Sequence, residues 1–195
     1  TVTFRHWWLV KLGLAENRLV TKYMRAGTEY EHKILRKIGI EGMDRQIKIR
    51  HLRLRVNLDG EDAIIHEVKT HSKPVFRVTK PYWMQAQVEM YAAKKQLRIV
   101  AYRMEEENYI NFFLPIDMDR ISYHPIAYDY DWVHIHYLPR LKYLARCMRK
   151  GVMPNESDYQ GYVDRLGKSK ANRFLRFGLR LLGGIRSLAG QGTRY

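Results

Sequence analysis

The sequence predicts a mixed α/β domain in which a central mixed β-sheet is flanked by helices. Apolar residues recur at helical spacing in some segments and alternate strictly in others, and these segments follow one another in the order αα, ββ, α, ββ, α. The length of 195 residues and the 46% hydrophobic content suit one domain with a sizeable core. An aromatic content of 12% argues against wholesale disorder.

Two helices are expected at the start of the chain. Helical periodicity runs from Phe4 to about Tyr23, and again from Thr28 to about Ile38. Gly27 is expected to break the chain between the two helices, and Gly39 to end the second.

A β-hairpin is expected next. The stretch RQIKIRHLRLRVNL, residues 45–58, alternates apolar and basic residues, as a strand with one solvated face does. The segment DGED, residues 59–62, has the composition of a turn, and AIIHEVKT, residues 63–70, has that of the returning strand.

The second half of the sheet follows a helix. Residues 81–96 have helical periodicity, and residues 97–104 and 109–116 predict a second strand pair joined by the polar turn EEEN. A long helix is then expected from Asp129 to about Lys150.

The charge of the chain indicates a polyanionic partner. Lys and Arg number 35 and Asp and Glu 20, which gives a net charge of +15. Nucleic acid is favoured over a membrane because no apolar run approaches the roughly 20 residues that span a bilayer. Cys147 is the single cysteine, so no internal disulfide is expected, and we recognise no signal peptide. These features predict a cytoplasmic protein.

The last part of the chain differs in composition, which predicts a domain of residues 1–158 and a basic extension of residues 159–195. Asp164 is the only acid of the extension. Its residues 171–188 could form an amphipathic helix with Arg173, Arg176 and Arg180 on one side. Three roles stay open: packing on the domain, gripping DNA, and binding a lipid surface.

One short segment indicates chemistry. In IHEVKTH, residues 65–71, Glu67 and Lys69 are two positions apart and therefore project from the same face of a strand. Hydrolysis of a phosphodiester needs a hard cation held by oxygen ligands and a positive group near the phosphate. A solvated ion pair is the alternative interpretation.

Four motifs taken in order give this segment a context. They resemble the successive motifs of the PD-(D/E)XK nuclease superfamily, most closely its lambda-exonuclease-like (YqaJ-type) branch, which phages encode for recombination. The motifs are AGTEYEHKIL, VNLDGE, HEVKTH and YWMQAQVEMYAA. The stretch YLPRLKYLARCMRKGVMP also resembles the closing helix of that branch, so the resemblance runs from about Arg25 to Pro154. It implies a restriction-endonuclease-like core.

The resemblance implies a set of site residues. Lys69 would position or activate the attacking water. The implied catalytic residues are Glu31, Asp59, Glu67, Lys69 and Gln87, and the implied metal ligands are Asp59, Glu67, Glu31 and the carbonyl of Val68.

Two glutamines compete for one position on the helix that follows. Gln85 and Gln87 are two residues apart and therefore point in different directions, so one of them is expected to reach the site. We favour Gln87 because of its spacing to Tyr91, which would support it.

The resemblance also implies an activity and partners. It implies a Mg²⁺- or Mn²⁺-dependent deoxyribonuclease, a hydrolase that resects linear double-stranded DNA 5′ to 3′ for homologous recombination, together with a single-strand annealing protein. A homotrimer is implied, encoded by a phage or prophage and acting in the bacterial cytoplasm. The alternatives are another nuclease of the same fold, such as an endonuclease or a repair or CRISPR-adaptation nuclease, and a non-catalytic DNA-binding protein.

Basic residues near the motifs are candidates for contacts to DNA phosphates. Arg25, just before the first motif, is also a candidate for binding a terminal 5′ phosphate. The candidates are Arg25, Arg53, Arg55, Lys73, Arg77 and Lys80.

Asp59 presents a difficulty. If DGED is a tight turn, Asp59 lies at its tip, roughly 13 to 17 Å from Glu67, and one cation cannot bridge that distance. Either the turn falls at about Asp62 to Ile64, or the chain lacks loop residues between Asp59 and Glu67. We favour the second explanation.

Overall fold

The structure is a computed structural model that describes residues 2–11, 14–16 and 21–165. The chain divides into two compact units, Thr1–Leu138 and Pro139–Tyr195. The boundary expected at residue 158 falls inside the second unit. The helix expected over residues 171–188 lies outside the described residues.

The first unit holds the sheet and every residue predicted for the site. Its elements are α1 (Val2–Lys11), α2 (Lys22–Lys37), β1 (Gly42–Ile49), η1 (Arg50–Leu52), β2 (Leu54–Glu61), β3 (Ile65–His71), α3 (Lys80–Ala93), β4 (Leu97–Arg103), η2 (Glu106–Tyr109), η3 (Met118–Arg120), β5 (Ile121–Ile126) and η4 (Trp132–Tyr137). The chain continues into α4 (Leu138–Lys150) and a helical stretch over residues 156–165.

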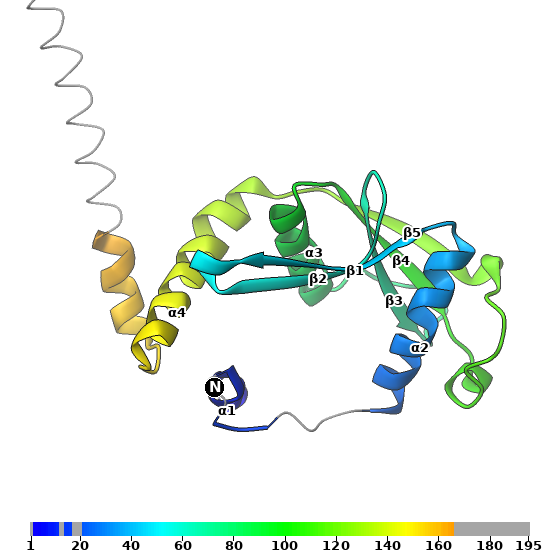
Figure 1. The fold of residues 1–195 in the computed structure, drawn as a ribbon, viewed down its shortest axis with the longest axis horizontal. Helices are drawn as coiled ribbons and strands as arrows, with labels where there is room; N and C mark the ends of the chain where they lie inside the picture. The colour runs from blue at the N-terminus through cyan, green and yellow to red at the C-terminus, as the bar shows by residue number, and fades with distance from the viewer. Residues whose placement is uncertain (1, 12–13, 17–20, 166–195) are drawn as a thin grey trace, which may run out of the picture. The chain divides into compact units, whose positions relative to one another are not determined.

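The five strands form one mixed sheet in the order β1-β2-β3-β4-β5 (Figure 1). Strands β3 and β4 are parallel and are joined through α3, whereas all other neighbours are antiparallel. Side chains of α2, such as Tyr30 and Ile34, pack with Val68 on one face. Ala86 and Met90 of α3 pack with Ile65 on the other face. The mixed α/β fold with flanking helices is therefore confirmed.

Helix α2 is continuous, so the break expected at Gly27 is wrong. The helix begins at the N-cap Thr21, whose hydroxyl accepts a hydrogen bond from the Met24 amide at 3.2 Å. One glycine costs about 1 kcal/mol in a helix interior, and the complete burial of neighbours such as Ala26 and Tyr30 outweighs that cost. The helix ends just before Gly39, which has a φ of 81°.

Residues 45–58 do not form one strand, because the chain reverses inside them. Strands β1 and β2 form a hairpin around η1, and Arg53 adopts the left-handed conformation with a φ of 50°. The turn contains no glycine or proline. Its mark in the sequence is the pair Arg50 and His51, where the apolar positions shift from 47 and 49 to 52 and 54.

The segment DGED is also not a turn as a whole. Strand β2 runs through Asp59 to Glu61, and the turn to β3 covers Asp62 to Ile64. The Asp62 carboxylate accepts the Ile64 amide at 2.9 Å, so its side chain closes the turn. The explanation based on missing loop residues is therefore wrong, and the alternative turn position is confirmed.

Strands β2 and β3 separate soon after this turn. They pair only at Gly60 with His66 and at Glu61 with Ile65. Beyond that point β2 pairs with β1 alone, and the two strands extend as a ribbon past β3 (Figure 1). The sheet is therefore open at the level of Asp59.

The strand expected over residues 109–116 is wrong. A capping box between Glu105 and Asn108 starts η2, which ends at the first residue of this stretch, and the residues that follow η2 form turns and irregular chain. Strand β5, at Ile121–Ile126, pairs with β4 instead.

The long helix expected from Asp129 to Lys150 is confirmed with one difference. Helical structure begins at Tyr130, and η4 is a π-helical segment before α4. Among the residues that the structure describes, no helix has both the length and the apolar character needed to cross a bilayer.

Candidate functional site

Glu67 and Lys69 lie on the face of β3 that α3 covers. Glu67 is only 1% exposed, and its Oε1 accepts hydrogen bonds from Lys69 Nζ and, at 2.6 Å, from Gln85 Nε2 of α3. An ion pair on a solvated strand would leave the carboxylate in water. The burial of Glu67 therefore excludes the solvated ion pair.

Asp59 lies beside Glu67. In the antiparallel register of β2 and β3, Gly60 pairs with His66. Extending this register by one residue sets Asp59 opposite Glu67. Asp59 Oδ2 accepts the Val68 amide at 2.8 Å, a bond that a backbone carbonyl of β2 would accept in a closed ladder. The Asp59 side chain thus fills the gap where the strands separate, and the expected separation of 13 Å or more does not arise.

Glu89 of α3 completes this group and was not among the residues predicted from the sequence. It is 2% exposed, and its Oε1 accepts a hydrogen bond from Gln85 Nε2 at 2.8 Å. The same Gln85 amide nitrogen therefore bridges Glu67 and Glu89. One signal was available: Glu89 is the only acid of α3, and it follows Gln85 by four residues, which puts both side chains on one face. We call Asp59, Glu67, Glu89 and Lys69 the acidic centre.

Gln87 points away from the acidic centre, so the preference for Gln87 over Gln85 is wrong. The Gln87 side chain is fully buried, donates to the Ala127 carbonyl at 2.8 Å and accepts the Asp129 amide at 2.7 Å. These bonds hold the chain after β5. Two residues correspond to about 200° of helix rotation, so only Gln85 can face β3. Tyr91, expected to support Gln87, packs its ring edge-on against His134.

The acidic centre brings three carboxyl groups, two of them buried, close to one ammonium. Burial raises the pKa of Glu67 to about 8 and that of Asp59 and Glu89 to about 7, with further increases from the neighbouring carboxylates. Burial is the largest single influence on the Lys69 ammonium and lowers its pKa, but the charge and hydrogen bond of Glu67, together with the charges of Asp59 and Glu89, outweigh it and raise the pKa of Lys69. Oε2 of Glu67 and Oε2 of Glu89 are buried without a hydrogen-bond partner. A cation in contact with these oxygens would satisfy both.

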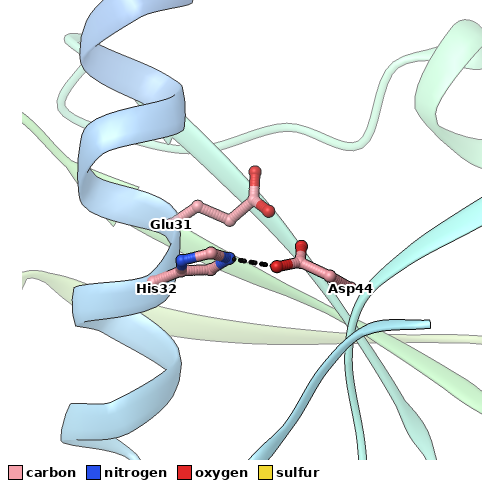
Figure 2. Close-up of side chains that lie close together, drawn as sticks. All are labelled: Glu31, His32 and Asp44. Carbon is pink, nitrogen blue, oxygen red and sulfur yellow. Dashed lines mark ion pairs between the residues drawn. The ribbon is translucent and has the colours of Figure 1, made fainter.

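A second group lies between α2 and β1. Glu31, His32 and Asp44 each contribute one ligand atom, and these three atoms lie within 4.8 Å of one another. His32 Nε2 is 2.8 Å from Asp44 Oδ2. Figure 2 shows the Glu31 carboxylate directed towards Asp44 and not included in that ion pair. In the part of the chain that the structure describes, no other group of three His, Cys, Asp or Glu side chains converges this closely. We call these three residues the outer triad.

Glu31 connects the two groups electrostatically. Burial, and then the negative charge of Asp59, raise the pKa of Glu31 to about 7. Its two partners in the outer triad are more exposed, with 42% of the His32 side chain and 63% of the Asp44 side chain accessible. The predicted helix acid therefore lies near the predicted metal ligands without contacting them directly.

All six basic residues predicted to bind DNA are exposed. None of them forms an ion pair with another described residue. Arg55 lines a pocket of about 500 Å³ together with Gln85 and Glu89. Lys73 and Arg77 line another pocket, in the segment that joins β3 to α3. Cationic side chains therefore line both of these pockets.

Comparison with known proteins adds little to this geometry. No family model matches the chain, and no curated protein matches it significantly. Among solved structures, the protein SSO0001 is similar over 77% of this chain and 86% of its own, with 14% identity and a TM-score of 0.33. A TM-score this low does not establish a shared fold, so we draw nothing from it.

Proposed function

We propose that this chain is a Mg²⁺- or Mn²⁺-dependent nuclease that hydrolyses DNA phosphodiester bonds at the acidic centre. One observation carries the proposal: Glu67 and Glu89 are both buried, and each keeps one carboxylate oxygen without a partner beside Asp59 and Lys69. Burying a carboxylate without compensation is costly. Hard divalent cations prefer oxygen ligands of this kind.

The donor set fits such an ion in its chemistry, and its side chains would have to draw closer together to hold one, because their ligand atoms do not converge within 4.8 Å as those of the outer triad do. Asp59, Glu67 and Glu89 would hold it, with the carbonyl of Val68 and Glu31 as further candidates. When bound, the ion would lower the pKa of a water and neutralise charge on the phosphate.

Lys69 supplies the positive group of the proposed mechanism. It donates one hydrogen bond to Glu67, and an ammonium has three protons to donate. The remaining protons can hold the attacking water or stabilise the negative charge that develops on the phosphoryl oxygens. Gln85 fixes the carboxylates of Glu67 and Glu89 relative to each other through its shared amide nitrogen.

We further propose membership of the PD-(D/E)XK superfamily, in its lambda-exonuclease-like branch. The mixed sheet between α2 and α3 is the architecture that the resemblance implies, and Asp59, Glu67 and Lys69 lie together, as it requires. The most specific form of the proposal is a homotrimeric exonuclease of a phage or prophage. It would resect linear DNA ends 5′ to 3′ in the bacterial cytoplasm and pass the strand to a single-strand annealing protein.

The test is digestion of end-labelled linear DNA and closed circular DNA with Mg²⁺, with Mn²⁺ and with EDTA. We expect the linear DNA to shorten from its 5′ ends with either ion, the circle to stay closed, and EDTA to stop the reaction. Lys69→Ala should cleave at least about 100-fold more slowly. Glu29→Gln, at an exposed acid of α2, is the matched control and should stay fully active. Nicking of the circle would favour an endonuclease. Binding without cleavage in either metal would favour a non-catalytic DNA-binding protein and overturn the proposal.

A further inference from the structure

A pocket of about 660 Å³ lies beside the acidic centre, at the N-terminal ends of α2 and α3 and along the segment after β3. Its connection to the centre is Tyr82, whose ring lines the pocket and lies 5.3 Å from Lys69 Nζ. The volume is within the range of about 300 to 1,000 Å³ that is typical of small-ligand sites. The nuclease chemistry proposed above makes no use of this pocket.

Two aromatic pairs from different elements line the pocket. Phe76 and Tyr82 stack with centroids 6.0 Å apart and an interplanar angle of 8°. Tyr23 of α2 and Tyr109 of η2 meet edge to face at 5.2 Å. Aromatic rings of this kind bind nucleobases by stacking, whatever the base.

The charged residues of the pocket are cations. Lys73 and Arg77 line it, and no acidic residue does. Both cations are exposed, and neither forms an ion pair with another described residue. A planar group that carries a phosphate matches this combination of rings and cations.

We propose that this pocket binds one unpaired nucleotide of the substrate strand, next to the phosphate that the acidic centre hydrolyses. The base stacks on the aromatic rings, and its phosphate contacts Lys73 and Arg77. The inference rests on the proposed function and sharpens it, because the preferred substrate is then a strand with a nucleotide outside the duplex stack: an overhang, a flap or a frayed end.

A second pocket of similar character provides a matched control. Tyr91, Tyr128 and Tyr130 line it with Lys94, at the C-terminal end of α3, and its volume is about 390 Å³. No residue of the acidic centre lines it. Tyr130 is 63% exposed and Tyr23 56%, so the loss of either ring should be tolerated equally well by the fold.

The experiment measures stacking directly. A DNA duplex carries an overhang with one 2-aminopurine, an adenine analogue whose fluorescence falls on stacking, and Ca²⁺ replaces Mg²⁺ so that the strand stays intact. The full chain should quench the signal on binding. Tyr23→Leu and Phe76→Leu should each weaken binding about 5-fold or more, as expected for one lost base stack. Tyr130→Leu should bind like the wild type, and circular dichroism checks the fold of each variant.

Several outcomes would overturn the inference. One is an equal loss of binding in Tyr130→Leu. Another is unchanged binding in the correctly folded Tyr23→Leu and Phe76→Leu variants. A third is a free 2-aminopurine mononucleotide that binds as tightly as the oligonucleotide, which would indicate a small-molecule site.

The two proposals fail separately. Quenching that depends on Tyr23 and Phe76, without any cleavage in Mg²⁺, supports the nucleotide pocket and contradicts the nuclease. Cleavage that depends on Lys69, with normal binding in both pocket variants, supports the nuclease and contradicts the nucleotide pocket.

Discussion

The acidic centre and the outer triad are built from similar side chains in opposite environments. In the outer triad the ligand atoms converge within 4.8 Å, but His32 and Asp44 satisfy each other, His32 is half-buried and Asp44 is exposed. In the acidic centre, Glu67 and Glu89 are at most 2% exposed and keep unpartnered oxygens. Water stabilises an exposed carboxylate without any ion, whereas a buried one needs a partner. We therefore expect a cation in the acidic centre rather than in the outer triad, and the variants below test this expectation.

The largest effect is expected when the acidic centre loses a ligand. Glu67→Ala should abolish cleavage and divalent-ion binding, because a methyl group cannot replace an oxygen ligand of a hard cation. Isothermal titration with Mn²⁺ measures the binding. Asp44→Ala, in the outer triad, is the control and should titrate like the wild type. An unchanged Mn²⁺ titration of Glu67→Ala would remove it from the ligand set.

Loss of the ammonium should affect the reaction more than binding. Lys69→Ala should lower the cleavage rate by about 10²- to 10³-fold, the usual effect of removing one group that stabilises developing charge. DNA affinity should stay within a few-fold, since in the proposed function the exposed basic residues would supply most phosphate contacts. Single-turnover cleavage measures the rate, and filter binding measures the DNA affinity. Lys73→Ala is the control with the opposite expectation: it should weaken DNA binding more than it slows cleavage. Full turnover in Lys69→Ala would contradict the assignment.

A smaller effect links stability to pH. The raised pKa values mean that the folded protein keeps protons that the unfolded chain releases above about pH 4.5. The stabilisation is therefore complete below about pH 4 and is lost as the pH rises through 7 to 8. Without metal, the melting temperature should fall between pH 5.5 and pH 8, and Mn²⁺ should raise it at pH 8 much more than at pH 5.5.

A double variant distinguishes the pH dependence caused by the acidic centre from that caused by other titrating groups. Glu67→Gln with Glu89→Gln removes two of the carboxylates, so its melting temperature should depend less on pH and on Mn²⁺. Scanning fluorimetry of both proteins gives the comparison. A wild-type melting temperature that does not change when Mn²⁺ is added at pH 8 would count against a cation in the acidic centre.

The smallest effect is expected in the outer triad. Its ion pair is largely exposed, and such pairs contribute between zero and about 1 kcal/mol. His32→Ala should therefore change the free energy of unfolding by less than about 1 kcal/mol and the cleavage rate by less than about 3-fold. Urea denaturation and the cleavage assay measure both. If His32→Ala lost Mn²⁺ binding, the metal site would be the outer triad and not the acidic centre.

Periodicity was sufficient to predict much of the fold. It predicted β3, α3 and β4 closely, and the E-x-K spacing predicted that Glu67 and Lys69 share a face. Local patterns failed where a neighbouring element decides the conformation. The reversal at η1 has no turn residue and is marked only by a change of phase in the alternation at Arg50 and His51. Helix α2 continues through Gly27 because Ala26 and Tyr30 are buried in the core.

The site was predictable only in part for a related reason. The position of Asp59 depends on the three-residue turn that Asp62 closes, and a turn shifted by a few residues separates Asp59 from Glu67. Glu89 looks like any helical acid until α3 is set against β3. The motif spacing favoured Gln87, but the rotation of the helix brings Gln85 to the carboxylates.

The hydrogen bond from the Val68 amide to Asp59 makes this one backbone proton a reporter of the site. In a closed ladder, its protection from hydrogen exchange would depend on the strand alone, but here it depends on a side-chain carboxylate. Protonation of Asp59, or its engagement by an ion, alters the acceptor and therefore the chemical shift of that amide. Asp59→Asn keeps an oxygen acceptor while removing the charge. The Val68 amide resonance can thus show, without any substrate, whether Asp59 acts as a charged ligand or only joins β2 to β3 through this hydrogen bond.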